Sequence, residues 1–451
     1  MRPSVAAQPP RLNTGIRRTH WPWSLGTVRT ITDNAQMSTP PAATPPRRRR
    51  RWLTRRFLVR FLVAFLVLNV VGIGAASWYY SDRIESDALH VHHSVDARPF
   101  TVAALEESSG AITLAPVAGD AALDWQTRDL YTPMVQGLYW DGGAAQSVTP
   151  APALPSGPTD LILKVTLING TWPAVGARIG SHTFAFPRGI VEPWQTITFP
   201  SPTGTLDAAF QPGVTMPASI GNDLWAVMVH GKGASPDEFT RLATSTTAYG
   251  LPTLAITYRG DDGMPPEPND RYGFGVSEWP DLEAAIAYAV GQGAKGVVLG
   301  GASMGGAVVA SFMRHAKDTS MVKAIILDAP ALSFARTVQW GADQIALPGG
   351  MPLPAPVTWG AKKLSTWRFG VDWDATDYLT DPSWDTLPTL LFHGDSDLTV
   401  PVSTSREFAA ARANVTYVEV KGAGHVASWN MDPGAYDRAV TTFLAKNLPR
   451  D

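Results

Sequence analysis

Residues 296–313 read GVVLGGASMGGAVVASFM, and this stretch decides the fold. A strand-length apolar run comes first, and a helix-forming run begins near Ala307. Between them stands a Gly-x-Ser-x-Gly turn, with Ser303 at its centre and Gly301 and Gly305 on either side. A serine on so sharp a strand-to-helix turn is strained, and only small neighbours let the turn close. The turn exposes the hydroxyl and aims the helix N-terminus at it, where amide donors favour negative charge.

From residue 196 onward, apolar runs of strand length alternate with helical stretches. The runs are hydrophobic on both faces, as buried parallel strands must be. We expect a hairpin at 196–210, a capping box at Ser235–Glu238 and helices at Asp281–Val290 and Ala307–Met313. Strands are expected at Trp225–Val229, Thr253–Thr257, Gly296–Leu299, Ala324–Leu327, Thr389–Phe392 and Thr416–Val420. The alternation predicts a doubly wound, mostly parallel α/β sheet.

A serine hydroxyl is a weak nucleophile and needs a general base. His425 lies in a glycine-rich loop after the last expected strand, and we predict that it is this base. His230 and His393 each end a strand and precede a glycine, so we expect them to brace their loops. The remaining histidines lie on arms or helix surfaces, or have no special setting.

The base needs an acid to fix its tautomer and stabilise the imidazolium. Asp397, in the segment HGDSDLTVP after the strand that ends at residue 392, is the first candidate. Asp395 is its near rival, and Asp328 is a second rival that we interpret as a helix or turn cap. The chain order Ser303, Asp397, His425 is that of α/β-hydrolases.

An oxyanion hole for this chemistry needs two backbone donors. We predict the amide of Met304, which follows the nucleophile, and the amide of Lys232, in the loop after the first long strand. The Lys232 side chain is expected to point to solvent.

A long apolar segment follows an arginine-rich stretch. Residues 61–80, FLVAFLVLNVVGIGAASWYY, would rise about 30 Å as a helix, which is one hydrocarbon thickness. The aromatic residues 78–80 would lie at the far interface. Arginines before the span and acids after it predict a single-pass signal anchor, with a cytoplasmic N-terminus and an extracytoplasmic enzyme. A cleaved signal peptide, with the protein then secreted, is the alternative, because residues 74–77 are small enough for a peptidase.

These features divide the chain into segments. We expect a disordered basic arm at 1–60, a transmembrane helix at 61–80, a stalk at 81–96, a small β-rich domain at 97–195 and the α/β-hydrolase domain at 196–451. The Trp-, Pro- and Gly-rich stretch 333–385 is expected to be a cap over the active site. Asn169-Gly170 predicts a hairpin turn. Met37 reads as a more natural start, so 1–36 is expected to be an upstream mis-assignment.

Composition excludes several function classes. The absence of cysteine excludes a thiol nucleophile and a Cys-ligated zinc site. Residues 1–60 hold thirteen arginines and one acid, which leaves 24 basic and 38 acidic residues for the rest. So acidic a body is not expected to bind nucleic acid. We expect no metal and no cofactor, since the three histidines at 90, 92 and 93 lack an acid cluster beside them.

At these motifs the chain resembles the α/β-hydrolase superfamily, in the branch of serine aminopeptidase-like and monoglyceride-lipase-like hydrolases. The resemblance covers roughly 196–447 and rests on His230-Gly231, Gly301-x-Ser303-x-Gly305, His393-Gly394-x-x-Asp397 and Gly424-His425. It implies that Asp397, rather than Asp395, is the acid. The arrangement of anchor, β-rich leader and hydrolase domain also looks like that of membrane-anchored hydrolases of high-GC bacteria.

The resemblance and the motifs together predict a serine hydrolase that acts by acyl transfer on a small-molecule ester. A serine peptidase, acting on aminoacyl or acyl-peptide substrates, shares this machinery and stays an alternative. A non-catalytic binding protein on the same fold is a second alternative, although none of its usual marks, such as a missing triad member, is present. The sequence does not indicate an oligomeric state.

Overall fold

The computed structural model describes residues 50–91, 98, 100–117, 134–147, 160–182, 194–213 and 223–448. The chain divides into two compact units, Met1–Ala64 and Phe65–Asp451. Most of the expected basic arm at 1–60 lies outside the described residues, as do His92 and His93 of the expected stalk.

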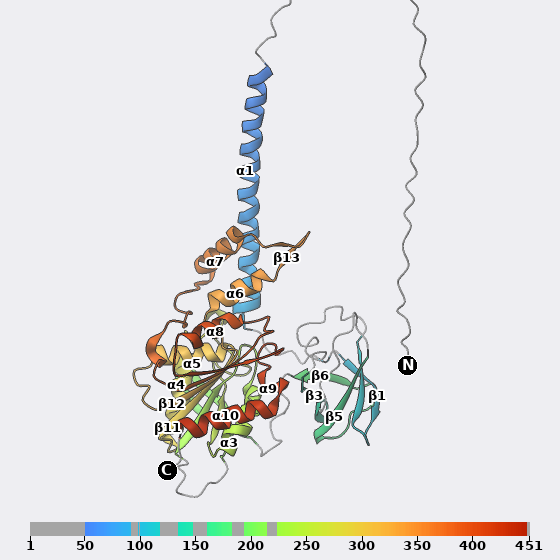
Figure 1. Cartoon of the computed structure of the whole chain (residues 1–451), viewed down its shortest axis with the longest axis vertical. Coiled ribbons are helices and arrows are strands. Elements are labelled where there is room, and N and C mark those ends of the chain that lie inside the picture. The colour runs from blue at the N-terminus through green and yellow to red at the C-terminus, as the bar shows by residue number, and fades with distance from the viewer. Residues whose placement is uncertain are drawn as a thin grey trace, which may run out of the picture. The chain divides into compact units, whose positions relative to one another are not determined.

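An eight-stranded sheet forms the centre of the larger unit (Figure 1), with the strand order β16-β15-β12-β11-β9-β10-β8-β7. Five neighbouring pairs, from β16 to β10, are parallel, whereas β7, β8 and β10 pair antiparallel. All six expected strands and the opening hairpin are present, so the predicted sheet is confirmed. The strands are β7 (Gln195–Ser201), β8 (Gly204–Gln211), β9 (Leu224–Val229), β10 (Thr253–Ile256), β11 (Gly296–Ala302), β12 (Val322–Asp328), β15 (Thr389–Gly394) and β16 (Val415–Val420).

Helices cover both faces of this sheet, which explains why its central strands are apolar on both sides. Every residue of β11 is buried. One hydrophobic cluster holds α4 (Trp279–Gly291), α5 (Met304–His315) and α8 (Val402–Ala410), and the other holds α3 (Thr240–Ala248) and α10 (Pro433–Asn447). The short helices are η2 (Pro236–Phe239), η3 (Pro268–Asp270), η4 (Pro382–Trp384) and α9 (Ser428–Met431).

Residues 333–385, which we call the cap insertion, lie between β12 and β15 in the chain, where the sequence predicts a cap. They form α6 (Phe334–Asp343), a small hairpin of β13 (Ala346–Leu347) and β14 (Met351–Pro352), and α7 (Ala355–Phe369), before η4 leads back to the sheet.

The expected β-rich region contains a closed six-stranded barrel with the order β1-β2-β5-β4-β3-β6. Its strands are β1 (Phe100–Glu106), β2 (Ala111–Pro116), β3 (Gly137–Trp140), β4 (Gly143–Ser147), β5 (Leu161–Gly170) and β6 (Arg178–His182). The first half of β5 alternates buried and exposed residues, and its buried side chains join the barrel core. The predicted hairpin at Asn169-Gly170 is wrong, because β5 continues through Gly170 to pair with Gly143, and β6 pairs with β1 and β3 instead.

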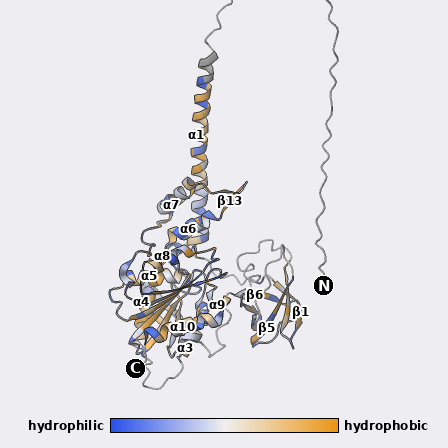
Figure 2. Cartoon of the chain, viewed as in Figure 1, coloured by the Kyte–Doolittle hydropathy of each residue, from blue (hydrophilic) through white to orange (hydrophobic). Residues whose placement is uncertain are grey.

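The helix α1 (Arg50–Arg83) contains the expected span. Among the described residues it belongs to the one helix, Arg55–Leu89, that is long and apolar enough to cross a membrane, and its apolar side chains are exposed. Figure 2 shows the hydrophobic band along α1. The same properties fit a signal sequence near an N-terminus.

The described part of the expected stalk, residues 81–91, packs against the core. A π-helix, η1 (Ile84–Leu89), continues from α1, and Ile84, Leu89 and Val91 join the larger hydrophobic core. Val91 donates a backbone hydrogen bond to the carbonyl of Asp270. The apolar side chains at 84, 89 and 91 are too few and too widely spaced to give a readable period, so the sequence pattern did not reveal this docking.

The buried position of Leu89 predicts a large effect on stability. Leu89→Ala should lower the free energy of unfolding by about 2–5 kcal/mol, because it removes a core side chain and leaves a cavity. Val290→Ala is the matched control, since this apolar side chain on α4 is 42% exposed and should change stability by less than about 0.5 kcal/mol. Thermal unfolding in detergent measures both, and equal effects would contradict the docking of η1.

Candidate active site

Ser303 occupies a strained turn between β11 and α5. Its backbone has φ 50° and ψ −119°, a conformation that costs about 1–3 kcal/mol and needs support from its surroundings. The support comes from the adjoining strand end: the Ser303 amide donates to the Asp328 carbonyl at 3.0 Å, and the Ala331 amide donates to the Ser303 carbonyl at 2.9 Å. The hydroxyl is thereby held at the carboxyl edge of the sheet.

The two glycines of the motif are required by close backbone contacts. A Cβ at Gly305 would lie 1.9 Å from the carbonyl oxygen of Val229, and a Cβ at Gly301 would lie 2.8 Å from the carbonyl oxygen of Gly305. Distances this short are not found between real atoms, so a larger residue at either position would push α5 away from the sheet.

His425 is placed between the serine and a carboxylate. Its Nε2 lies 2.9 Å from Ser303 Oγ, and its Nδ1 lies 2.7 Å from Asp397 Oδ2. Because the carboxylate can only accept, Nδ1 carries a proton and donates it, which leaves Nε2 free to accept from the hydroxyl. Burial lowers the pKa of His425, but Asp397 more than offsets this, so the pKa is raised above its ordinary value.

Asp397 is buried, and four groups hold its carboxylate. Oδ1 accepts from the amides of Thr399 at 2.7 Å and Val400 at 2.9 Å, while Oδ2 faces both His425 and, at 3.1 Å, His393 Nε2. Burial raises the pKa of Asp397, yet the two imidazoles outweigh burial and hold the pKa well below its usual range. The carboxylate therefore stays ionised beside the base.

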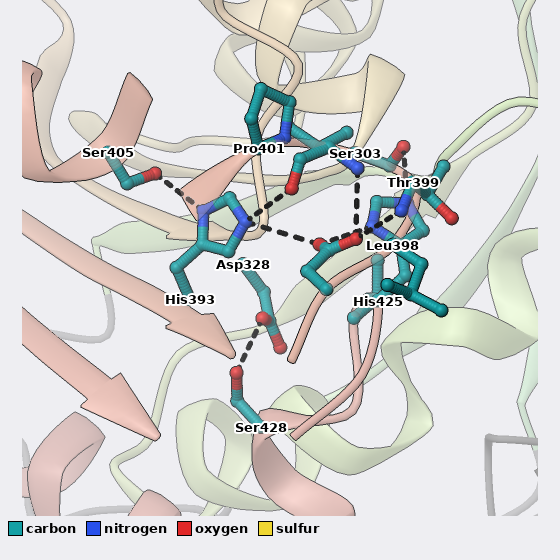
Figure 3. A network of polar contacts seen from close by, with 12 residues as sticks. Ser303, Asp328, His393, Leu398, Thr399, Pro401, Ser405, His425 and Ser428 are labelled. Carbon is teal, nitrogen blue, oxygen red and sulfur yellow. Dashed lines mark hydrogen bonds and ion pairs between the residues drawn. The ribbon is translucent and has the colours of Figure 1, made fainter. Parts of the chain in front are cut away.

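His393 braces the acid loop, as the sequence predicts. Its Nδ1 accepts from the Ser405 hydroxyl at 2.6 Å, and its Nε2 points to the Val400 carbonyl and to Asp397 (Figure 3). Because Nε2 faces two acceptors, it carries a ring proton that it can donate to them.

The two rival acids have other partners. Asp395 is exposed and accepts from the Gly422 amide at 2.6 Å, which ties its loop to the segment before His425. Asp328 is buried at the end of β12, and it accepts from the Ser428 hydroxyl at 2.8 Å rather than from the backbone amide of a turn (Figure 3). Burial raises the pKa of Asp328.

Both expected oxyanion residues adjoin the nucleophile. Lys232 and Met304 line one cavity of about 510 Å³ together with Ser303, and no acceptor for either amide is found in the described part of the chain. The Lys232 side chain does not point to solvent as expected. Its Nζ donates to the Asp87 carbonyl at 2.5 Å, and burial lowers its pKa. The sequence could not indicate this contact because Asp87 lies 145 residues away.

Sequence reasoning missed a buried pair that supports two loops of the site. Glu238 accepts from the Gly231 amide at 2.7 Å, and Arg241 donates to the Val426 carbonyl at 2.5 Å. The two side chains lie 3.9 Å apart. The expected capping box is therefore only half formed: Ser235 caps η2, whereas the carboxylate of Glu238 binds the oxyanion loop.

His230 also stabilises the oxyanion loop. Its Nδ1 lies 2.9 Å from the Gly231 carbonyl and its Nε2 lies 3.0 Å from Asp261 Oδ2, so both nitrogens face acceptors. Burial lowers the pKa of His230, but Asp261 outweighs burial and the pKa is raised. Tyr258 stacks on the ring and donates to the Gly231 carbonyl at 3.1 Å. This matches the bracing role predicted from sequence.

The environment of His425 predicts the pH dependence of Ser303 reactivity. The neutral imidazole accepts the hydroxyl proton, so labelling by a fluorophosphonate should fall as pH drops through the pKa of His425, with a midpoint above about 6.5. Asp397→Asn removes the carboxylate that contributes most to raising this pKa and should move the midpoint down, whereas Asp395→Asn should leave it unchanged. Labelling rates across pH 5–9 measure this, and one midpoint for all three proteins would contradict the assigned geometry.

Comparison with known proteins gives a family match for the sheet region. Residues 226–439 match the model described as Alpha/beta hydrolase family. No curated protein matches the chain.

Solved structures with similar folds include several esterases. The esterase Pf2001 of Pyrococcus furiosus is 18% identical, with a TM-score of 0.39, and the match covers 56% of this chain and 92% of that one. Est1E of Butyrivibrio proteoclasticus is 19% identical, with a TM-score of 0.39, covering 56% and 98%. A bacterial membrane phospholipase A is 19% identical, with a TM-score of 0.41, covering 57% and 87%. The matched residues 226–439 are just under half of the chain, and over this region the chain is similar to the α/β-hydrolase family.

Proposed function

We propose that this protein is a membrane-anchored serine hydrolase that cleaves carboxylic esters by acyl transfer. The observation that supports the proposal most directly is the continuous hydrogen-bonded chain from Ser303 through His425 to Asp397. The family match of residues 226–439 supports hydrolase chemistry in general.

The geometry suits the following reaction. Ser303 Oγ attacks the ester carbonyl while its proton passes to His425 Nε2, and the carbonyl oxygen becomes an oxyanion that the Lys232 and Met304 amides stabilise. The carbonyl re-forms, the bond to the alcohol breaks, and the imidazolium gives its proton to the leaving oxygen. Water, deprotonated by His425, then attacks the acyl-serine. The bond to Ser303 Oγ breaks, the imidazolium returns its proton to this oxygen, and the acid is released. Asp397 stays ionised throughout and stabilises the imidazolium.

The cavity favours an uncharged acyl group over a peptide N-terminus. Most of its lining residues are apolar, including Phe274, Phe334 and Val338. Among the described lining residues Asp87 is the sole carboxylate, and it pairs with Arg83 at 2.6 Å. An aminopeptidase needs a negative group to receive a substrate ammonium, since an unpaired charge is costly away from water. We therefore place ester hydrolysis before the peptidase alternative, and before the non-catalytic alternative because the full relay is in place.

The anchor and its orientation are part of the proposal. The exposed apolar side chains of α1 suit a lipid environment, and in water they would form a large unfavourable patch. Arginines precede the span and Asp82, Glu85 and Asp87 follow it, which supports an extracytoplasmic hydrolase domain.

Substrate turnover tests the chemistry. The protein should hydrolyse p-nitrophenyl acyl esters at least tenfold faster than aminoacyl-nitroanilides. Ser303→Ala should abolish turnover, and Asp397→Asn should lower kcat by on the order of 10³–10⁴ because the base loses its tautomer partner. Asp395→Asn is the matched control and should stay within about twofold, since it alters the neighbouring carboxyl outside the relay. Faster nitroanilide turnover would favour the peptidase.

Fractionation tests the anchor. Hydrolase activity should stay with washed membranes, and a protease added outside should reach the hydrolase domain, because α1 remains attached. Release of active protein that begins near Ser77 would instead identify the apolar segment as a cleaved signal sequence.

A further inference from the structure

The end of α1 and the π-helix η1 form one wall of the cavity that contains Ser303. Tyr80, Arg83, Ile84, Asp87 and Ala88 all line it. The cap insertion and the loop after Asp397 supply the other walls. A helix that only tethers an enzyme has no need to line the cavity that holds the nucleophile.

Specific contacts fix this wall to the cap insertion. Ser77 Oγ donates to the Val357 carbonyl at 3.2 Å, and Arg368 pairs with Asp82 at 2.6 Å. The Arg368 guanidinium also lies 4.0 Å from the centre of the Trp78 ring, close enough for a cation–π interaction. These contacts hold the end of α1 against α7, and the two helices together support the cavity.

Exposed aromatic residues surround the point where α1 meets α7. Trp359 and Trp367 of α7 are 66% and 74% exposed, and Trp78 and Tyr79 of α1 are also exposed. Trp78 and Trp367 lie edge to face with their ring centres 6.5 Å apart. Tryptophan and tyrosine prefer the lipid–water interface, so this group marks the depth at which the protein meets the bilayer surface.

The cavity begins at that same depth. Tyr80 is the last residue of the apolar span and also a lining residue, and Ala88 lies eight residues further, about 12 Å along a helix. Asp87, beside Ala88, binds the side chain of Lys232 in the oxyanion loop. The cavity wall formed by α1 and η1 thus extends from the bilayer surface to the oxyanion loop beside Ser303.

We infer that the substrate is a long-chain acyl ester of a lipid in the leaflet where α1 emerges, drawn into the cavity along the juxtamembrane wall. The inference rests on the proposed hydrolase function and adds the substrate class and its route. The apolar lining receives the acyl chain, while the ester reaches Ser303 near the Lys232 amide and the headgroup stays toward the interface.

The full-length protein in phosphatidylcholine vesicles tests this route. The substrates are fluorogenic derivatives of phosphatidylcholine, phosphatidylglycerol and diacylglycerol that all carry the same acyl chain. Each is placed either in the vesicles that contain the protein or in separate vesicles. At least one of the three should be hydrolysed tenfold or more faster in the protein's own vesicles, because the lipid then reaches the wall without leaving the bilayer. Equal rates for both placements, or no lipid hydrolysis, would overturn the inference.

A paired substitution tests the wall. Ala88→Trp should narrow the cavity and lower hydrolysis of the best of these lipids at least tenfold. It should lower p-nitrophenyl acetate turnover and fluorophosphonate labelling by a smaller factor, because these small reagents occupy less of the lining. Ala75→Trp makes the same change on the exposed side of α1, outside the cavity lining, and should leave all three readouts near wild type.

The readouts separate two kinds of failure. Absent acetate turnover and absent labelling in the wild type would refute the proposed hydrolase itself. Normal acetate turnover with lipid hydrolysis equally fast in Ala88→Trp would refute the membrane route alone.

Discussion

The left-handed backbone of Ser303 is the constraint on which the site depends. A serine held at φ 50° needs neighbours that fix it, and hydrogen bonds to the end of β12 do so. The close approach to β9 leaves room only for glycine at 305, and the backbone at the start of α5 leaves room only for glycine at 301. Loops after β11, β15 and β16 then bring hydroxyl, carboxylate and imidazole to one sheet edge, because parallel strands end together there.

The relay is also supported by charges outside it. Glu238 and Arg241 are both buried, so leaving either without its partners would be costly. One holds the amide of Gly231 beside the nucleophile, and the other holds the carbonyl of Val426 just after the base. A single short segment, η2 with the start of α3, thus sets the distance between the oxyanion loop and the base loop.

The structural features that were predicted correctly from sequence depend on interactions between residues close together in the chain. A few neighbouring residues are enough to recognise each of three features. These are the glycines around Ser303, the strands that are apolar on both faces and the loop after the last strand. The failures depend on contacts that no local pattern shows: Gly170 pairs with Gly143, Glu238 turns to Gly231, and η1 enters the core. The sequence pattern left Asp395 as a near rival of Asp397, because the two carboxylates are two residues apart, and the family resemblance supported Asp397.

The proposed lipid route has an energetic consequence, because it places α1 in the cavity wall. Moving an acyl chain from bilayer to water costs roughly 0.8 kcal/mol per CH₂, so about 12 kcal/mol for a chain of fifteen methylenes. A cavity that starts at Tyr80, at the end of the apolar span, keeps most of that chain in contact with apolar surface during transfer. The free-energy cost of moving the acyl chain into water then no longer limits access of the ester to Ser303. Under the proposed route, a hydrolase domain without α1 would face that barrier at each turnover, and this is the physical argument for a cavity that is continuous with α1 and η1.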